Sequence, residues 1–552
     1  MSITIQVTNG PFLCSEVPMA GKSVLAECEP DKCIARSGAE IVAWRVNRYL
    51  RSLDWVLDED SEVSFVDTSS FEGMEVYRRS LSFLLVIAAN RALHRDVIVR
   101  HSISEGYYWE FADGDISEDD IRAIRSTMDD LISQDIPITR RVLSIDKAKR
   151  IFERQGSPEG ARLFAWSGED PVELYKCADR YGFYYAPLAP STGYLRDYDL
   201  IPFSPGMVLR FPTVGYPDRL PPFQASRNLS EVFLDYARWL HVLGVGTMDS
   251  LHRMVADGKG NELILISEAL HAQKLARIAE DIAARQAVKV VAIAGPSGSG
   301  KTTFSERLKI QLQVCGKKPV VVSLDNYFLD REQTPRDAEG NFDFEVLEAL
   351  DLRLLEDQLR RIIAGDEVTL PVFDFREGRK KTGPKLRLGP RDILIIEGIH
   401  GLNDAVTAPI PDDVRYGLFV SPLTGICLDW HNRTSTTDNR LLRRLVRDAR
   451  SRGHSAEATL ALWPKVIRGA MEYIFPYQKR ADAMFNSSIP YELAVLKGYV
   501  QPVLHTVPED SPVYGEARRL LGMLKFVPMI PSEAIPNNSI IREFIGGSCF
   551  NV

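Results

Sequence analysis

Apolar positions in the second half of the chain predict strands alternating with helices. A continuous apolar run precedes a segment that repeats apolar residues at helical spacing, and the same order recurs further on. The predicted strands are Val288–Ala294, Pro319–Leu324 and Ile393–Ile396, and the predicted helices are Thr303–Val314, most of 344–364 and 438–452. This alternation predicts an α/β fold with a doubly wound parallel sheet that binds ligands at the carboxyl ends of its strands.

The pattern of apolar and polar residues in the first half of the chain predicts two α+β units. In residues 1–67, alternating strands at Ile3–Val7 and 62–67 flank a helical stretch predicted at Ile41–Leu50. In residues 68–222, the helices 76–93 and 118–133 accompany aromatic strands at 106–111 and 182–186. Helical segments at 229–245 and 264–286 predict a linker, residues 223–286, which leads into an α/β domain of residues 287–552.

Composition narrows the functional classes. The net charge of -8 in 552 residues argues against a protein that chiefly coats nucleic acid. Seven scattered cysteines without a C-x-x-C pair suit a reducing compartment. The longest near-apolar run, Leu81–Ala89, is too short to span a bilayer, and the first residues have no secretory leader pattern. We therefore expect a cytoplasmic protein with no membrane partner.

The segment VVAIAGPSGSGKTT, residues 290–303, has the G-x-x-x-x-G-K-[ST] spacing of a phosphate-binding loop. Backbone N–H groups of such a loop and of the following helix surround nucleotide phosphates. Lys301 would neutralise the β- and γ-phosphates, and the Thr302 hydroxyl would bind Mg²⁺. The predicted nucleotide-binding residues are Gly295, Ser297, Gly298, Ser299, Gly300, Lys301, Thr302 and Thr303. The alternative is a glycine turn without a ligand.

Two acidic residues follow predicted strands beside this loop. Asp325 comes directly after the strand PVVVSL, where a carboxylate can accept the proton of a hydroxyl acceptor. Glu397 ends the apolar run DILIIE and is expected to bind a metal ion opposite Thr302. A single Asp after a strand is more often a helix cap. Two acidic residues at strand ends beside a phosphate-binding loop favour phosphoryl transfer.

Four arginines recur at helical spacing in the predicted helix 438–452. They are Arg440, Arg443, Arg444 and Arg447. This spacing places them on one helix face, where they repel one another unless an anion lies between them. A triphosphate supplies that anion, so we expect a mobile lid that closes on the phosphoryl group. The alternative is a solvated charged face.

The ordered motifs GPSGSGKTT, SLDNYF, NFDFE, LPVFDF, IIEGIHGL and TDNRLLRRLVRD resemble the uridine kinase and phosphoribulokinase group of P-loop kinases over about residues 288–493. The resemblance implies transfer of the ATP γ-phosphoryl group, with Mg²⁺, to a nucleoside 5′-hydroxyl. It implies that Asp325 is the general base and that Asp343 binds sugar hydroxyls. It also implies that Thr302 and Glu397 hold Mg²⁺, and it assigns lid and sugar-side roles to three arginines, Arg444, Arg447 and Arg452.

The residues expected to bind the acceptor depart from the pattern of that family. The uridine–cytidine kinases that this segment resembles share an aromatic pair followed by a histidine that binds the base. This chain has Phe373, Phe375 and Gly378 at the corresponding positions. The two phenylalanines either stack on a base or belong to the core. The basic stretch 376–391, with Arg379 expected to bind the substrate, is either a hairpin flap over the acceptor or a solvated loop. Which base the site prefers stays an open question.

The first half resembles two synthetase domains. Residues 41–67 resemble the TGS domain, and the following region resembles the second additional domain of threonyl-tRNA synthetases. That domain's H-x-x-x-H and C-x-x-x-H ligands correspond here to Arg79, Phe83, Cys177 and Tyr181. One thiolate cannot form a zinc site, so we expect neither zinc nor editing, but a scaffold, regulator or binding module. With the kinase-like part, the whole chain resembles a fused nucleoside kinase family.

Three alternatives remain open. The acceptor is either a nucleoside or another small hydroxyl compound. A GTPase is less favoured because the chain has no N-K-x-D tetrapeptide after the loop. A nucleotide-dependent regulatory protein that binds RNA through its first half is the third possibility. We also expect a homo-oligomer.

Overall fold

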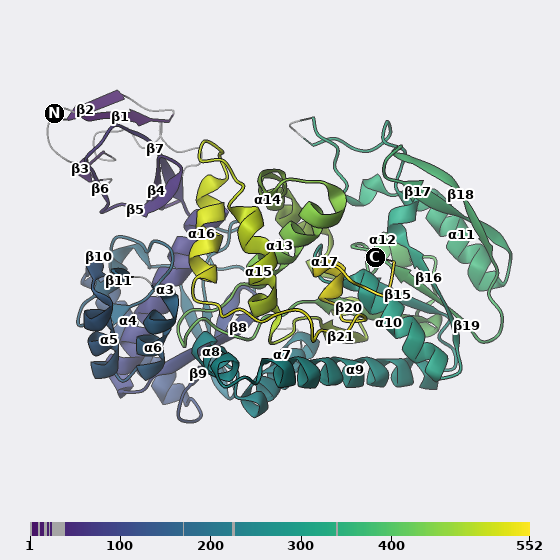
Figure 1. The fold of residues 1–552 in the computed structure, drawn as a ribbon, viewed down its shortest axis with the longest axis horizontal. Coiled ribbons are helices and arrows are strands. Elements are labelled where there is room, and N and C mark those ends of the chain that lie inside the picture. Colours follow the sequence, from purple (N-terminus) through teal and green to yellow (C-terminus); the bar gives the residue numbers. More distant parts are fainter. Residues whose placement is uncertain are drawn as a thin grey trace.

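The computed structural model describes residues 3–8, 12–15, 19–20, 23–24, 39–168, 170–223, 227–337 and 340–551. Figure 1 shows an N-terminal sheet and a helix-rich unit at one end of an elongated molecule and a large sheet with its helices at the other. The α/β fold class with two preceding α+β units, expected from the sequence, is confirmed. Three of the cysteines, Cys14, Cys28 and Cys33, have no described side chain.

The N-terminal unit is a mixed five-stranded sheet in the order β2-β1-β7-β4-β5. The helix predicted over residues 41–50 is wrong, because this segment forms an antiparallel hairpin. Asn47 and Arg48 take positive φ values of 46° and 73° at its turn, and β4 also pairs with β7. Its strands are β1 (Ile3–Val7), β2 (Phe12–Ser15), β4 (Ile41–Val46), β5 (Tyr49–Ser52) and β7 (Ser61–Asp67), beside the small pair β3 (Met19–Ala20) and β6 (Val56–Leu57).

The second unit packs two antiparallel sheets around the long helix α3 (Phe71–Leu93). Ser70 caps this helix by accepting from the Gly73 N–H. The strand predicted at 182–186 ends at Gly182, and Phe183 and Tyr184 continue into the core without pairing. The other elements are β8 (Val97–Ile103), β9 (Gly106–Phe111), α4 (Glu118–Ser133), β10 (Ile138–Leu143), α5 (Ile145–Arg154), α6 (Pro158–Ser167), β11 (Val172–Cys177), β12 (Arg180–Gly182), β13 (Asp199–Phe203) and β14 (Gly206–Arg210).

Three helices connect this unit to the last one. They are α7 (Arg227–Leu243), α8 (Met248–Ala256) and α9 (Gly260–Ala284). In Figure 1, α9 runs beneath the large sheet. Its residue Glu268 accepts hydrogen bonds from Tyr491 and Ser539 at 2.6 and 2.5 Å, and Asp281 accepts one from Tyr416 at 2.6 Å. The connecting segment is therefore docked on the α/β domain along the length of α9.

The α/β domain contains a five-stranded parallel sheet in the order β16-β19-β15-β20-β21. Apolar residues fill both of its faces, as expected for strands covered by helices on both sides. The strands are β15 (Val290–Ala294), β16 (Lys318–Ser323), β19 (Asp392–Glu397), β20 (Arg415–Ser421) and β21 (Ala483–Asn486). The predicted strands of this domain are confirmed within a residue or two.

Helices complete the domain. The helix expected over 344–364 starts only at Leu352, because Asp351 caps it by accepting from the Leu354 N–H. The helix expected over 438–452 is α13 (Thr436–Arg447) followed by a π-helical turn at Asp448–Arg452. The helices are α10 (Lys301–Val314), α11 (Leu352–Ala364), α12 (Asp404–Thr407), α13, α14 (Ala456–Tyr473), α15 (Glu492–Leu504), α16 (Tyr514–Leu524) and α17 (Arg542–Ile545).

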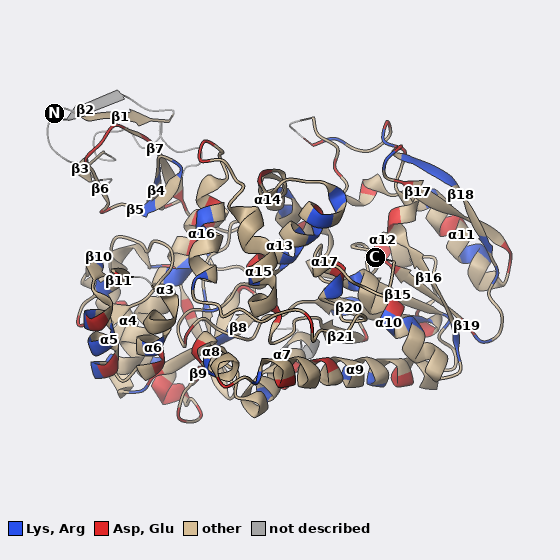
Figure 2. Ribbon diagram, in the orientation of Figure 1, with Lys and Arg blue, Asp and Glu red and all other residues tan. Residues whose placement is uncertain are grey.

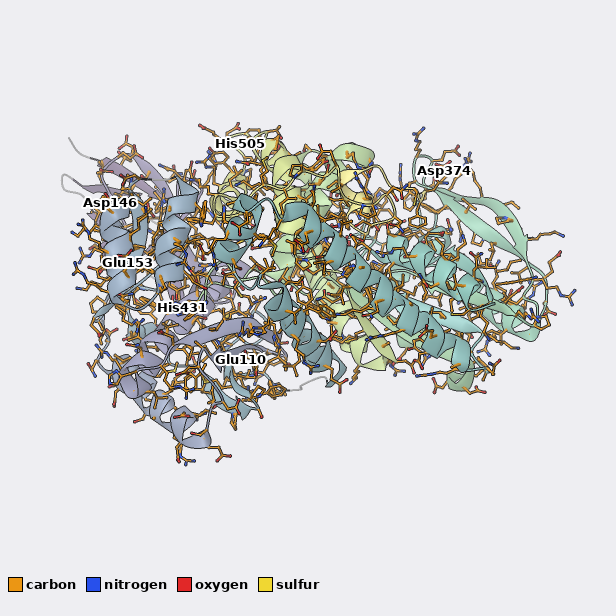
Figure 3. All side chains as sticks on the ribbon, turned by 60° about the horizontal axis from the view of Figure 1, so that its bottom comes forward. Glu110, Asp146, Glu153, Asp374, His431 and His505 are labelled. Atoms are coloured by element: carbon orange, nitrogen blue, oxygen red, sulfur yellow. The ribbon has the colours of Figure 1, made fainter. Side chains whose placement is uncertain are left out.

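The basic stretch forms part of a two-stranded hairpin. That this hairpin covers the acceptor stays a prediction. β17 (Val368–Asp374) pairs with β18 (Arg379–Leu386), and Figure 2 shows the Lys and Arg residues gathered on β18. Figure 3 shows Asp374 at the turn of this hairpin, on the outer side of the molecule. Across the described part of the chain, no helix combines the length and apolar character needed to cross a bilayer.

Candidate phosphotransfer site

The phosphate-binding loop connects the buried strand β15 to α10. Gly298 and Gly300 have φ values of 79° and 82°, which side chains with a Cβ rarely adopt. A Cβ at Gly295 would lie 2.1 Å from the carbonyl oxygen of Val420. Glycine is therefore needed at these three positions so that the loop can turn and pack closely on β20. The loop has the shape that the sequence pattern requires.

Lys301 begins α10 and its ammonium group folds back over the loop. Its Nζ donates to the carbonyl oxygen of Pro296 at 3.4 Å. Burial lowers the pKa of Lys301, and the nearby charges of Glu397 and Asp325 oppose that shift. The lysine thus lies within electrostatic reach of both predicted strand-end carboxylates.

Asp325 and Glu397 meet at the carboxyl ends of adjacent strands. In the parallel pair of β16 and β19, Ser323 lies opposite Glu397, and Asp325 follows in a 3₁₀ turn. Burial raises the pKa of both carboxyl groups. For Glu397, burial and then the charge of Asp325 raise the pKa to about 7. The two carboxylates and Lys301 form one electrostatically coupled group.

The loop and its surroundings suit a phosphate with a divalent cation. The hydroxyls of Ser299 and Thr303 are buried and have no hydrogen-bond partner among the described residues. Glu397 is a buried carboxylate on which the charge of Lys301 acts. Thr302 and Glu397 would hold Mg²⁺, which when bound neutralises charge on the phosphates. Oxygen ligands are those that this cation prefers.

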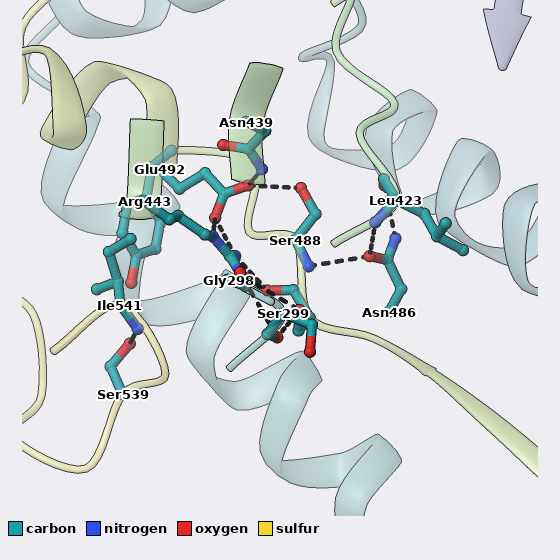
Figure 4. A network of polar contacts seen from close by, with 12 residues as sticks. Gly298, Ser299, Leu423, Asn439, Arg443, Asn486, Ser488, Glu492, Ser539 and Ile541 are labelled. Atoms are coloured by element: carbon teal, nitrogen blue, oxygen red, sulfur yellow. Dashed lines mark hydrogen bonds and ion pairs between the residues drawn. The ribbon is translucent and has the colours of Figure 1, made fainter. Parts of the chain in front are cut away.

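The arginine helix holds the phosphate loop, and the expected mobile lid is wrong for two of its residues. Arg440 and Arg443 are 2% and 0% exposed. Arg440 Nε donates to the Ser297 carbonyl at 2.9 Å, and Arg443 donates to the carbonyls of the next two loop residues, Gly298 and Ser299. Figure 4 shows the carboxylate that neutralises Arg443, which is Glu492. The fold itself thus supplies the anion that neutralises Arg443.

Arg444, Arg447 and Arg452 gather around Asp448, whose side chain is 1% exposed. Their closest nitrogens lie 3.1, 2.8 and 3.8 Å from its carboxylate oxygens. Arg444 also donates to the Ser297 hydroxyl at 3.0 Å. Asp448 thus orients the three arginines beside the loop, and the charges of Arg447 and Arg452 act on Asp325. The sequence analysis gave Asp448 no role.

Asp343 lies near Lys465, which also pairs with Asp337. The sequence analysis gave neither Lys465 nor Asp337 a role. Lys465 Nζ lies 3.4 Å from Asp343 and 2.7 Å from Asp337. The Glu345 N–H donates to Asp343 Oδ1 at 3.0 Å, and one buried Glu345 carboxylate oxygen has no hydrogen-bond partner in the described part of the chain. Lys465 lies 128 residues from Asp337 in the sequence, so spacing gave no signal for this pair.

The aromatic pair divides between the core and the surface. Phe373 is 6% exposed and packs against Phe328, whereas Phe375 is 60% exposed. Gly378 has a φ of 68°, and a Cβ there would lie 2.7 Å from the Arg331 guanidinium. The turn thus needs glycine at position 378. Arg379 is exposed and pairs with Glu377 at 2.6 Å, so its contact with a substrate stays a prediction.

In the synthetase-like half, Phe83 and Cys177 belong to one buried apolar cluster, and Tyr181 packs against another. The Phe83 ring lies against Gly182, where a Cβ would come within 2.8 Å. Burial raises the pKa of the Cys177 thiol to about 12, and Arg79 donates to the Pro187 carbonyl at 2.9 Å. No group of three or more potential metal ligands occurs among the described residues. The Cys177 thiol therefore lies in the same buried apolar cluster as Phe83.

Residues 290–493 match the model of the phosphoribulokinase / uridine kinase family. This segment is similar to the P-loop kinases of that family. The uridine kinases of Halalkalibacterium halodurans and Erwinia tasmaniensis are each 28% identical to the chain over 196 residues, which cover 35% of this chain and 84% of each kinase. The kinase domain thus accounts for most of the length of these relatives and for about a third of this chain.

The N-terminal part is similar to a different enzyme. A threonine–tRNA ligase of Acidithiobacillus ferrooxidans is 33% identical over 162 residues, 29% of this chain. The chain spans a quarter of the length of that ligase. Among solved structures, a putative fructose transport system kinase from Silicibacter sp. TM1040 is 21% identical and covers 38% of this chain and 98% of its own, with a TM-score of 0.27. A possible uridine kinase from Bacillus stearothermophilus covers 36% and 88%, with a TM-score of 0.24.

Proposed function

We propose that the kinase domain transfers the γ-phosphoryl group of ATP, with Mg²⁺, to the 5′-hydroxyl of a nucleoside. The observation that carries this proposal is the meeting of Asp325 and Glu397 with Lys301 at the carboxyl edge of the sheet. A nucleotide-binding protein without phosphoryl transfer needs the loop but not two carboxylates beside it.

Each group has a defined task in this proposal. The loop N–H groups and Lys301 bind the β- and γ-phosphates, and the arginines around Asp448 lie where the transferring group gains charge. Asp325 accepts the proton of the attacking hydroxyl, and burial raises its pKa toward the range useful for a base. Asp343, held by Lys465, is left to orient hydroxyl groups of the acceptor.

A second candidate is a kinase for another small hydroxyl compound. The observation in its favour is Gly378, which leaves the surface near Phe375 without an imidazole and with the Arg331 guanidinium instead. A site that reads a substrate through hydrogen bonds rejects analogues strongly, so a change of reading group changes the acceptor.

An acceptor panel separates the two candidates. Purified protein with ATP and Mg²⁺ is assayed for ADP release with the ribo- and deoxyribonucleosides, and in parallel with pentoses, hexoses and sugar phosphates. The proposal predicts that a nucleoside gives the highest kcat/KM. Turnover confined to the sugars would support the second candidate, and retention of RNA without any turnover would favour the regulatory alternative.

A further inference from the structure

The C-terminal segment beyond the family match reaches into the phosphate loop. Residues 539–547 include α17, which packs against α13 and lies near α10 in Figure 1. The Glu543 carboxylate accepts a hydrogen bond from the Thr303 backbone N–H at 3.1 Å. Thr303 is in the first turn of α10, so this N–H is one of the donors that a helix leaves free for an anion.

The contact is buried and lies inside the predicted nucleotide site. Thr303 is 0% and Glu543 8% exposed, and the Thr303 hydroxyl has no hydrogen-bond partner within the described residues. Ile540 packs on the loop itself, since a Cβ at Gly300 would lie 2.5 Å from its side chain. The charge of Glu543 also acts on Lys301. An anion thus already occupies one of the donors of the loop.

The segment is held in this position by specific bonds. Arg450 donates to the carbonyls of Glu543 and Phe544, each at 3.0 Å. Arg542 donates to the carbonyl of Ile535 at 2.7 Å, and Ser539 donates to Glu268 at 2.5 Å. These contacts aim the Glu543 side chain at the loop rather than into solvent.

We propose that Glu543 is a built-in competitor for the nucleotide phosphates, so that residues 539–547 must release the Thr303 N–H before ATP or ADP binds fully. The inference rests on the proposed nucleotide site at residues 295–303. A carboxylate and a phosphate cannot share one N–H donor, and their like charges repel at this distance. The C-terminal segment thereby sets the nucleotide affinity of the kinase domain.

Calorimetric titration of the full-length protein with ADP and Mg²⁺ tests this inference. Glu543→Gln keeps the shape and removes the charge, and Glu543→Ala removes the acceptor as well. Glu533→Gln is the matched control, because Glu533 is exposed in the same C-terminal region. We expect Kd to fall about tenfold in Glu543→Gln, equivalent to ~1.4 kcal/mol, and to stay unchanged in the control. Unchanged or weaker binding in Glu543→Gln would overturn the inference.

A second measurement separates competition from a simple change of charge. In the unaltered protein, ADP should increase the hydrogen exchange of the amides in residues 540–547, because the segment must move. Slower exchange there on ADP binding would show that Glu543 belongs to the bound state and would overturn the inference. If neither the unaltered protein nor either Glu543 variant binds ADP, the proposed nucleotide site fails together with it.

Discussion

Replacing Glu397 by Gln should stabilise the metal-free protein, and more so at alkaline pH. Glu397 is buried, and its pKa rises from 4.5 to about 7 in the folded chain. A carboxyl group with a raised pKa binds its proton more tightly in the folded than in the unfolded state. Stability therefore falls as the pH rises from about 4.5 through 7, and the loss is complete above pH 7.

The size of the effect follows from the shift. At 1.36 kcal/mol per pKa unit, the fully ionised carboxylate costs the folded state about 3 kcal/mol. By the same linkage, the cost is about 1.4 kcal/mol at pH 5.5, so the benefit of Glu397→Gln should be about 2 kcal/mol larger at pH 8. A carboxylate kept at this cost is consistent with a role in binding a cation.

Urea-induced unfolding of both proteins in EDTA, at pH 5.5 and at pH 8, measures this difference. Comparing the two proteins at each pH cancels the titration of the other groups. An equal difference in unfolding free energy at the two pH values would refute the reasoning. A destabilising effect of Glu397→Gln at pH 8 would show that the carboxylate is held by contacts stronger than its burial.

Three further changes test other parts of the site. Glu492→Gln should cost about 3–5 kcal/mol of unfolding free energy, because it leaves Arg443 buried without a counter-charge; urea midpoints measure it. Asp325→Asn should lower kcat by roughly 10²–10⁴-fold while calorimetry finds nucleotide binding retained. Gly378→Ala should cost about 1–3 kcal/mol locally, given its φ of 68° and the contact with Arg331, and should raise KM for the acceptor in steady-state assays.

Each of these has a contradicting result. A stable Glu492→Gln protein would mean that water or another group neutralises Arg443. Full activity of Asp325→Asn would remove this residue from the role of base, and loss of nucleotide binding would make it a binding residue. If Gly378→Ala changes neither stability nor KM, the hairpin turn relaxes and lies apart from the acceptor.

The parallel sheet and its phosphate loop were predictable because each depends on local pattern. Apolar runs bounded by turns gave the strands, and the glycine spacing gave the loop before Lys301. The helix prediction for residues 41–50 was wrong because the apolar residues of this segment occupy both faces of a buried strand. Pairing of β4 with β7 and the turn at Asn47 decide its structure, and neither is visible in helical spacing.

The partners of the site were less predictable than the site itself. The spacing of the arginines placed them on one helix, but the neutralisation of Arg443 by Glu492 depends on how α13 packs against α15. Glu543 contacts a residue 240 positions earlier in the chain. A single sequence carries no signal for such pairs, because they arise only when the chain folds.

Transfer of a labelled γ-phosphoryl group tests the central claim most directly. The protein is mixed with γ-labelled ATP, Mg²⁺ and the nucleoside preferred in the acceptor panel, and the product is analysed for label on the 5′-oxygen. The account predicts a labelled 5′-monophosphate with the unaltered protein and none with a folded Lys301→Ala variant. Label transfer at the full rate by Lys301→Ala, or label released only as inorganic phosphate by the unaltered protein, would contradict it.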